Sequence, residues 1–223
     1  MKIIAKIKND FHTKFGIPRQ SGLVNQVKSK IVFEPEYRVA EAFRGLEEYS
    51  HIWIIWEFSE SKREDWSPTV RPPRLGGNKR VGVFATRSPF RPSPIGLSCV
   101  KLEKIDFESK SGPVLLVSGA DLMNDTPIYD IKPYLPRIDS LPDAIGGFAD
   151  RVKDYKLSVC IDKKFQSEIP DDKLKAIKEI LSEDPRPSYH NDPSRIYGFN
   201  FAEYEITFKV DENILTVLNI KRN

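Results

Sequence analysis

Residues 49–58 read YSHIWIIWEF, and this stretch does most to decide the fold. Its aromatic and β-branched side chains favour a buried β-strand over a helix. Residues 1–8 alternate weakly as a first strand, and three later stretches are strand-like as well: RVGVFAT at 80–86, IGLSCVKLEKIDF at 95–107 and PVLLVSGADL at 113–122. Short strands separated by turns, without long helices between them, predict an antiparallel barrel or sandwich.

The stretch DTPIYDIKPYLP at 125–136 contains three prolines. Proline has no N–H to donate to a strand ladder and is therefore confined to edge strands, strand ends and bulges. We expect an extended, irregular return here rather than a central strand.

The composition changes near residues 140–155, which predicts a first domain over 1–145 and a second over 150–223. In the second, YKLSVCI is typical of a strand, and a helix begins at Pro170-Asp171 with Leu174, Ile177 and Leu181 on one face. NFAEYEITFKV at 200–210 alternates apolar and polar residues and forms a hairpin with ILTVLNI. The fold class is mainly β, with a small α/β C-terminal domain.

Composition excludes several classes of protein. No apolar run approaches the roughly 18–20 residues that a membrane span needs, and the charged start MKIIAKIKND does not resemble a signal peptide. Cys99 and Cys160 lie far apart, without metal-ligand spacing. Neither GxGxxG after a strand nor a phosphate-binding Walker loop is present. We expect a cytoplasmic protein without a membrane anchor or a metal.

The charge is unevenly distributed. The net charge is only +3, yet the segment from Trp66 to Lys101 holds seven basic residues, no acidic residue and six of the 17 prolines. Arginines on a stiff loop can grip a carboxylate or a phosphate. A local anionic partner and a plain solvated loop explain this segment equally well. A single histidine beside tryptophans is more often a core residue than a catalyst, so we assign His51 a structural role. Asp121, at a strand end, is assigned the structural role of a cap.

Five motifs taken in order carry more information than any one alone. They are PRQ, LEEYSHIWIIWEF, PTVRPPRLGG, GVFATRSPFRPSPIG and DTPIYDIKPYLP. This chain resembles the TsaA/TrmO-like family in these five motifs, which occur there in the same order. The similarity is dense over residues 1–145, and DPRPSY at 184–189 resembles the C-terminal extension of bacterial-type members. It implies an antiparallel β-barrel methyltransferase, typically a homodimer. The resemblance further implies that this enzyme would use S-adenosyl-L-methionine to methylate N6 of threonylcarbamoyladenosine at position 37, in the anticodon loop of tRNA.

The resemblance also implies which residues bind the cofactor. They are Pro18, Arg19, Gln20, Ser59, Glu60, Arg87, Leu97, Asp125, Thr126, Pro127 and Ile128. Arg19 or Arg87 suits the cofactor's carboxylate, while Leu97 and Ile128 suit the faces of its adenine. This chain has Asn124-Asp125 where relatives often have Asp-Gly, so a side chain stands where the family uses glycine.

The reaction needs positioning and the removal of one proton from the adenine nitrogen. We predict that Asp130 accepts this proton and that Arg87 or Arg91 holds its carboxylate in place; Arg87 is thus also counted as catalytic. The other basic residues of the segment are predicted to bind RNA phosphates, and an unpaired base could stack on Phe90. The predicted RNA-binding residues are Arg71, Arg74, Lys79, Arg80 and Arg91.

Two alternatives stay open. A non-catalytic nucleic-acid-binding barrel would need the same basic segment but no pocket for a small zwitterion. A methyltransferase with a different methyl acceptor would keep the cofactor residues and change only the substrate.

Overall fold

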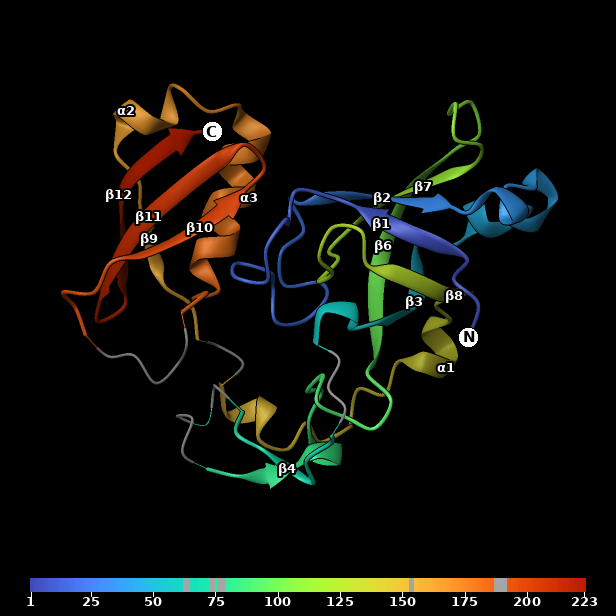
Figure 1. The fold of residues 1–223 in the computed structure, drawn as a ribbon, viewed down its shortest axis with the longest axis horizontal. Helices are drawn as coiled ribbons and strands as arrows, with labels where there is room; N and C mark the ends of the chain where they lie inside the picture. Colours follow the sequence, from blue (N-terminus) through green and yellow to red (C-terminus); the bar gives the residue numbers. More distant parts are fainter. Residues whose placement is uncertain (62–64, 73–74, 76–78, 153–154, 187–191) are drawn as a thin grey trace.

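The aromatic stretch forms strand β3 (His51–Glu57), in which every second residue is buried: Ile52, Ile54 and Trp56. This alternation places one face of the strand in a core and the other outward. The computed structural model describes residues 1–223 except 62–64, 73–74, 76–78, 153–154 and 187–191. Two bodies of regular structure are seen side by side, a barrel and an α/β unit (Figure 1).

The barrel is closed by six antiparallel strands in the order β1-β2-β7-β6-β3-β8. Besides β3 these are β1 (Ala5–Lys8), β2 (Lys28–Phe33), β6 (Ile95–Asp106), β7 (Val114–Ser118) and β8 (Pro127–Pro133). Inward-facing side chains from all six strands fill the interior, including Ile7, Ile31, Ile54 and Leu115, each fully buried. The predicted antiparallel barrel is confirmed, and the sandwich alternative is excluded.

Strand β8 contradicts the expectation of an irregular return over 125–136. It pairs with β1 on one side and with β3 on the other, and so closes the barrel. Its two prolines stand at the strand's ends, Pro127 opposite Lys6 and Pro133 opposite Ile52. A missing N–H interrupts the ladder least at these positions. The pairing with β3 also shifts register between Ile55 and Trp56.

The predicted strand over 80–86 is much shorter than expected. Only β5 (Val81–Gly82) is extended; it pairs with β4 (Thr69–Val70), and the turn η6 (Val83–Ala85) follows it. The β4–β5 ribbon lies apart from the barrel, at the lower edge of Figure 1. Short helical segments elsewhere are η1 (Pro35–Tyr37), η2 (Ala40–Phe43), η3 (Leu46–Glu48), η4 (Ser59–Ser61), α1 (Pro136–Asp139) and η7 (Ala149–Val152).

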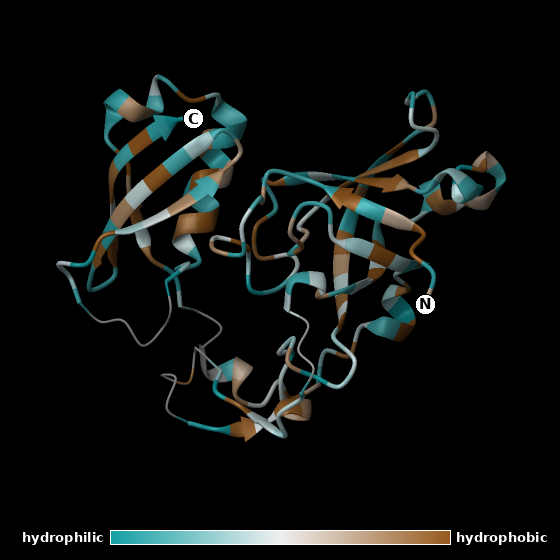
Figure 2. Cartoon of the chain, in the orientation of Figure 1, coloured by the Kyte–Doolittle hydropathy of each residue, from teal (hydrophilic) through white to brown (hydrophobic). Residues whose placement is uncertain are grey.

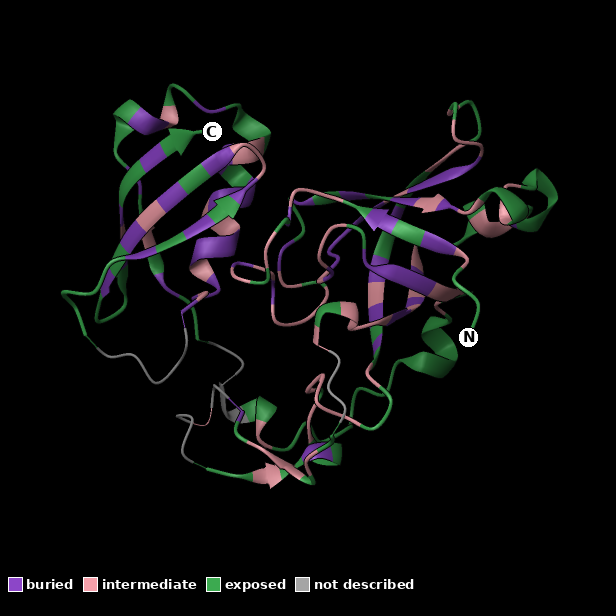
Figure 3. Ribbon diagram, in the orientation of Figure 1, coloured by how far each residue is buried: buried purple, intermediate pink, exposed green. Residues whose placement is uncertain are grey.

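The C-terminal unit has the predicted α/β form. Its sheet has the order β10-β11-β12-β9, with β10 (Tyr197–Phe201), β11 (Tyr204–Asp211), β12 (Ile214–Arg222) and β9 (Ser158–Cys160). The helices are α2 (Lys163–Gln166) and α3 (Asp171–Ser182), and α3 buries the predicted Leu174, Ile177 and Leu181. Apolar and polar residues alternate along β11 and β12 (Figure 2), and buried and exposed ones alternate in the same rhythm (Figure 3).

A loop of the N-terminal part, residues 9–27, packs into the C-terminal core. The Phe11 ring lies 5.4 Å from that of Phe201, and the Asp10 carbonyl accepts a hydrogen bond from the Ala202 amide at 3.1 Å. A Cβ on Gly16 would stand 2.5 Å from the Phe199 ring, so only glycine lets the loop approach this closely. The motif PRQ therefore lies between the barrel and the C-terminal unit.

Candidate active site

The residues expected to bind the cofactor gather at one rim of the barrel. Because β3 is antiparallel to β6 and β8, its end meets the starts of both: Trp56 is opposite Gly96 on β6 and Ile128 on β8. Ser59 and Glu60 follow β3 in η4 at this rim. Residues 125–128 lead into β8, and Leu97 follows the start of β6 with 55% of its surface exposed.

The PRQ loop is held against this rim by hydrogen bonds. The Arg87 guanidinium donates to the Gln20 side-chain oxygen at 2.5 Å, and the Gly22 amide donates to the Gly119 carbonyl at 2.8 Å. Arg19 points the other way and donates to the carbonyls of Asp184 and Arg186 in the C-terminal unit. Arg87 and Gln20 are thus brought together, while Arg19 fastens the loop.

Asp121, for which the sequence predicted only a strand-end role, lies at the same rim as Arg87. Asp121 accepts a hydrogen bond from the Ser98 hydroxyl at 2.5 Å, and Ser98 in turn accepts one from the Trp56 indole N–H at 2.9 Å. Burial raises the pKa of Asp121; hydrogen bonds from Ser98 and from backbone amides, and the positive charge of Arg87, offset only part of that rise. This carboxyl group therefore keeps its proton to a higher pH than a solvated one.

Gly96 makes this chain of hydrogen bonds possible. A Cβ at position 96 would lie 2.2 Å from the Trp56 indole, so the ring can cross β6 only where no side chain stands. Ser98, two residues later, is 1% exposed and occupies an inward position where the strand pattern expects an apolar residue. A polar residue at such a position is the one sequence signal that points to Asp121.

Asp125, which stands where relatives often have glycine, adopts a backbone conformation typical of glycine. Asp125 has a φ of 67°, the left-handed region that favours glycine and that Asp and Asn tolerate best among other residues. Its backbone amide donates to the Ile7 carbonyl at 2.8 Å, and its carboxylate pairs with Lys8 and accepts a hydrogen bond from the side-chain amide of Asn124 at 2.7 Å. Thr126, Pro127 and Ile128 are buried, so the Ile128 side chain is not open to the face of an adenine as predicted, and the Ile128 carbonyl accepts a hydrogen bond from the Ile4 amide at 2.8 Å.

Asp130 lies away from the arginines that were expected to hold it. It stands opposite Ile55, further from the rim, and forms an ion pair with Lys132 at 2.9 Å. Arg87 bonds Gln20, and Arg91 donates to the carbonyls of the 83–86 turn. The expectation that Arg87 or Arg91 holds Asp130 is therefore wrong. The antiparallel register of β8 turns Asp130 toward a hollow that Ile4 and Tyr37 also line.

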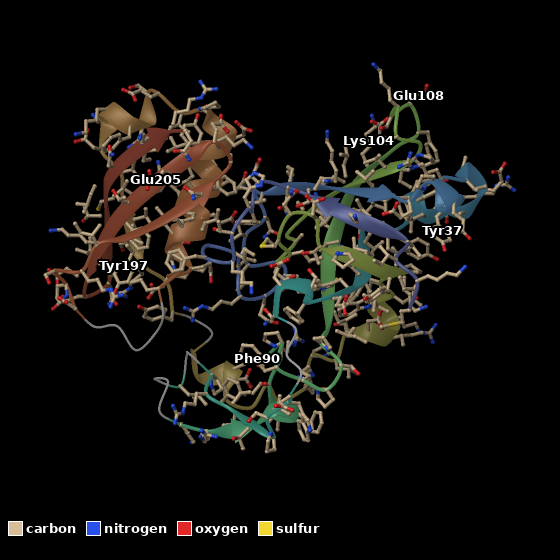
Figure 4. All side chains as sticks on the ribbon, in the orientation of Figure 1. Tyr37, Phe90, Lys104, Glu108, Tyr197 and Glu205 are labelled. Carbon is tan, nitrogen blue, oxygen red and sulfur yellow. The ribbon has the colours of Figure 1, made fainter. Side chains whose placement is uncertain are left out.

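The basic segment surrounds the β4–β5 ribbon. Arg71, Lys79 and Arg80 are exposed, and Arg80 donates to the Thr69 hydroxyl at 2.9 Å. Arg91 donates to the Val83 carbonyl at 3.3 Å and to the Thr86 carbonyl at 2.7 Å, which gives it a structural task. Arg74 lies outside the described residues. Phe90, the predicted stacking residue, is partly buried below the barrel, close to the ribbon (Figure 4).

Two features are absent from the part of the chain that the structure describes. None of its helices combines the length and apolar character that crossing a membrane requires. No three His, Cys, Asp or Glu side chains there are grouped so that they could hold a metal ion.

The fold and the site together define a small β-barrel protein with a polar, arginine-bearing site at one rim and an α/β unit braced against its rim loop. Residues 6–140 match the family model described as the tRNA-methyltransferase O N-terminal domain, and residues 156–223 match the TrmO C-terminal domain. The chain belongs to the tRNA-methyltransferase O family, which confirms the resemblance drawn from its motifs.

Individual relatives agree with this assignment. A protein of Escherichia coli (strain K12) named tRNA (adenine(37)-N6)-methyltransferase is 38% identical over 94% of this chain and 92% of its own length. A protein of Methanothermobacter thermautotrophicus named probable S-adenosyl-L-methionine-binding protein is 36% identical over 62% of this chain and 91% of its own. A crystal structure of TrmO from Pseudomonas aeruginosa superposes with a TM-score of 0.77 at 29% identity and covers 98% of this chain and 97% of that one.

Proposed function

We propose that this protein is an S-adenosyl-L-methionine-dependent tRNA methyltransferase that methylates N6 of the adenine at position 37. The observation that carries the proposal is the convergence, at one rim, of the family's motif residues with the polar cluster of Gln20, Arg87 and Asp121. A relative that bears this activity in its name matches nearly the whole chain.

The rim residues suit the proposed cofactor chemically. S-adenosyl-L-methionine, when bound, supplies a methyl group on a sulfonium centre and presents a carboxylate, an amine, a ribose and an adenine. Arg87 and Gln20 offer donors for a carboxylate, and Leu97 offers an exposed apolar surface. Residues 125–128 lie at the same rim, where the amides of Asp125 and Thr126 already donate to the carbonyls of Ile7 and Met123. Ser59 and Glu60 at the end of β3 belong to the same proposed site. Pro18 and Arg19 shape the loop that carries Gln20.

The chain's part in the chemistry is positioning and proton removal. N6 of a threonylcarbamoylated adenine bears one proton, which must leave as the new N–C bond forms and the C–S bond breaks. A carboxylate at the rim can accept that proton. Asp121 suits this role better than the Asp130 predicted from sequence, because Asp121 lies within the field of Arg87 and accepts a hydrogen bond from the Ser21 amide, while Asp130 pairs with Lys132.

The substrate is proposed to be tRNA engaged through its anticodon loop. The exposed cations Arg71, Lys79 and Arg80 would neutralise phosphates, and Arg74 belongs to the same predicted set. Arg91 adds charge from a fixed position. A homodimer and a cytoplasmic location complete the proposal, both on the strength of the family.

One experiment tests the proposal against both alternatives. Transfer of labelled methyl from S-adenosyl-L-methionine is measured on tRNA isolated with and without the threonylcarbamoyl group. Transfer only to the modified tRNA is the expected result. Transfer to neither tRNA, together with no thermal shift by the cofactor, would leave the non-catalytic binding barrel. A thermal shift without transfer to either tRNA would point to a different methyl acceptor, and equal transfer to both would show that the threonylcarbamoyl group is not recognised.

A further inference from the structure

Two large aromatic side chains are exposed together beside the β4–β5 ribbon. The rings of Trp66 and Phe84 are stacked, with centroids 6.1 Å apart and planes inclined by 29°. Trp66 is 50% exposed and Phe84 is 71% exposed, and neither belongs to a core. Exposed single apolar residues are common, but a stacked pair of rings on an open surface is a feature that calls for a partner.

A hydrogen bond ties the turn that carries Phe84 to the chain that follows Trp66. Phe84 lies in η6, whose first residue, Val83, is 1% exposed and donates its amide to the Pro68 carbonyl at 2.9 Å. That bond ties the turn that carries Phe84 to the strand that follows Trp66, beside the β4–β5 pairing of Val70 with Val81. The backbone that carries Phe84 is therefore tied to the chain beside Trp66 before any partner arrives, which lowers the entropy cost of binding.

The surroundings of the rings are positively charged. The Arg91 guanidinium carbon lies 5.6 Å from the centre of the Phe84 ring and is fixed there by its two carbonyl contacts. Arg80 is bonded to Thr69 in the neighbouring strand, and Arg71 follows β4 directly. No acidic residue occurs from Trp66 to Lys101; Asp65 is the nearest in sequence.

Stacked rings among cations match the chemistry of unpaired nucleotides. Aromatic side chains offer π-faces for bases, and the arginines offer donors for the phosphates between them. Paired bases in a duplex present no free face to such a surface. A second copy of this chain fits less well, because a symmetric contact through this surface would bring the same arginines face to face.

We propose that Trp66 and Phe84 form a stacking surface for an unpaired base of the RNA substrate. This inference rests on the proposed function and deepens it, since it assigns to Trp66 and Phe84 the stacking role that we predicted for Phe90. The partly buried Phe90 lies near the ribbon (Figure 4), whereas Phe84 presents most of its surface to solvent.

The test compares Trp66→Leu and Phe84→Leu with a matched control, Phe107→Leu, which alters a 47% exposed phenylalanine outside the basic segment. Affinity is measured for an anticodon stem–loop RNA and for a blunt RNA duplex over a range of salt concentrations. Each substitution at the stack is expected to weaken binding of the stem–loop about 5- to 100-fold. The salt slope should stay the same, because no phosphate contact is lost, and duplex binding should hardly change.

Controls separate this inference from the proposed function. Cofactor-induced thermal shifts and the oligomeric state of each variant are measured in parallel. If the wild type methylates tRNA and both stack variants bind the stem–loop like Phe107→Leu, the stacking surface is refuted and the enzyme stands. A change of oligomeric state with RNA affinity intact would instead make the pair a protein contact. A wild type that neither binds nor methylates tRNA would refute both proposals.

Discussion

The Arg19 guanidinium donates a hydrogen bond to the backbone carbonyl of Arg186 at 2.7 Å, across 167 residues of sequence. The same nitrogen donates to the Asp184 carbonyl at 3.0 Å. The loop that presents Gln20 to Arg87 is therefore fastened to the C-terminal unit. In this chain the C-terminal unit helps to position one wall of the candidate active site.

Replacing Arg19 should loosen this attachment. In Arg19→Ala both carbonyl contacts are lost, and we expect the free energy of unfolding to fall by about 1–3 kcal/mol. Because Gln20 is the next residue, the affinity for S-adenosyl-L-methionine should fall as well. Urea unfolding and calorimetric titration measure the two effects. Arg38→Ala, which removes a guanidinium contact to the Phe33 carbonyl elsewhere, should leave the cofactor affinity unchanged. Equal affinities in Arg19→Ala and the wild type would contradict the bracing role.

The Arg87–Gln20 contact should govern cofactor binding. Arg87→Ala removes both a cation and the donor to Gln20, and we expect the dissociation constant of S-adenosyl-L-methionine to rise about tenfold or more. Gln20→Ala should have a smaller effect, and the double variant should show less than the sum of the two because the residues share one bond.

Arg71→Ala serves as the matched control for Arg87→Ala. It alters an exposed cation of the basic segment, so it should weaken tRNA binding and reduce the salt slope with cofactor affinity retained. We assign Arg87 to cofactor binding and Arg71 to RNA binding. Loss of cofactor affinity in Arg71→Ala, together with loss of RNA affinity alone in Arg87→Ala, would contradict this assignment.

Elements with strong periodicity were predictable from the sequence. Alternation along 49–58, alternation within 200–210 and the apolar face of residues 171–183 depend on near neighbours, and they predicted β3, β11 and α3. The 200–210 stretch also holds the end of β10, so that β11 begins only at Tyr204. Strand β8 was missed because proline statistics do not reveal that Pro127 and Pro133 fall at strand ends. The 80–86 stretch was assigned too much strand, since η6 depends on a bond from Val83 to Pro68.

The site was only partly predictable, because it is assembled by contacts distant in sequence. Motif matching brought Gln20 and Arg87 into one set, and the structure joins them by a hydrogen bond. Asp121 was given only a structural role, since its importance arises from Ser98 and Trp56 on two other strands. The packing of Phe11 into the C-terminal core follows from tertiary contacts that no local pattern encodes.

A buried ion pair should make the stability of the C-terminal unit depend on pH. Burial on its own would raise the pKa of Asp184, but hydrogen bonds from Arg186 and Tyr155 outweigh it and the pKa is lowered. A lowered carboxyl pKa stabilises the folded state above the ordinary value near 3.8, and this contribution is lost as the pH falls through that value toward the folded pKa.

Asp184→Asn tests this at the level of stability. It leaves the buried Arg186 without its ionic partner, so the unfolding free energy at pH 7 should fall by about 3 kcal/mol and depend less on pH below 5. Urea unfolding between pH 3 and pH 7 measures both effects. Glu36→Gln, which removes an exposed pair with Lys2, should change stability by less than about 0.5 kcal/mol. An Asp184→Asn protein as stable as this control would refute the assignment.

Asp121 and Asp130 make opposite predictions for the proton-transfer step. If Asp121 is the acceptor, wild-type single-turnover methylation should rise with pH through a pKa above the ordinary carboxyl value, because only the ionised form takes a proton. The rate of Asp121→Asn should then fall about 10²- to 10⁴-fold and should no longer rise with pH through that pKa. The cofactor affinity of this variant should stay within a few-fold of wild type. Asp130→Asn should keep both the wild-type rate and its dependence on pH.

Ser98→Ala tests whether Asp121 takes part in proton transfer. If the role of Asp121 were purely structural, this substitution would not shift the pH dependence of the methylation rate. The Ser98 hydroxyl lowers the Asp121 pKa, so its removal should shift the acid limb of the rate profile to higher pH and leave the plateau in place. The opposite set of results, with Asp130→Asn inactive and Asp121→Asn unaffected, would return the role to the carboxylate predicted from sequence. The Lys132 pair would then have to open in the complex, since it occupies the Asp130 carboxylate in the structure described.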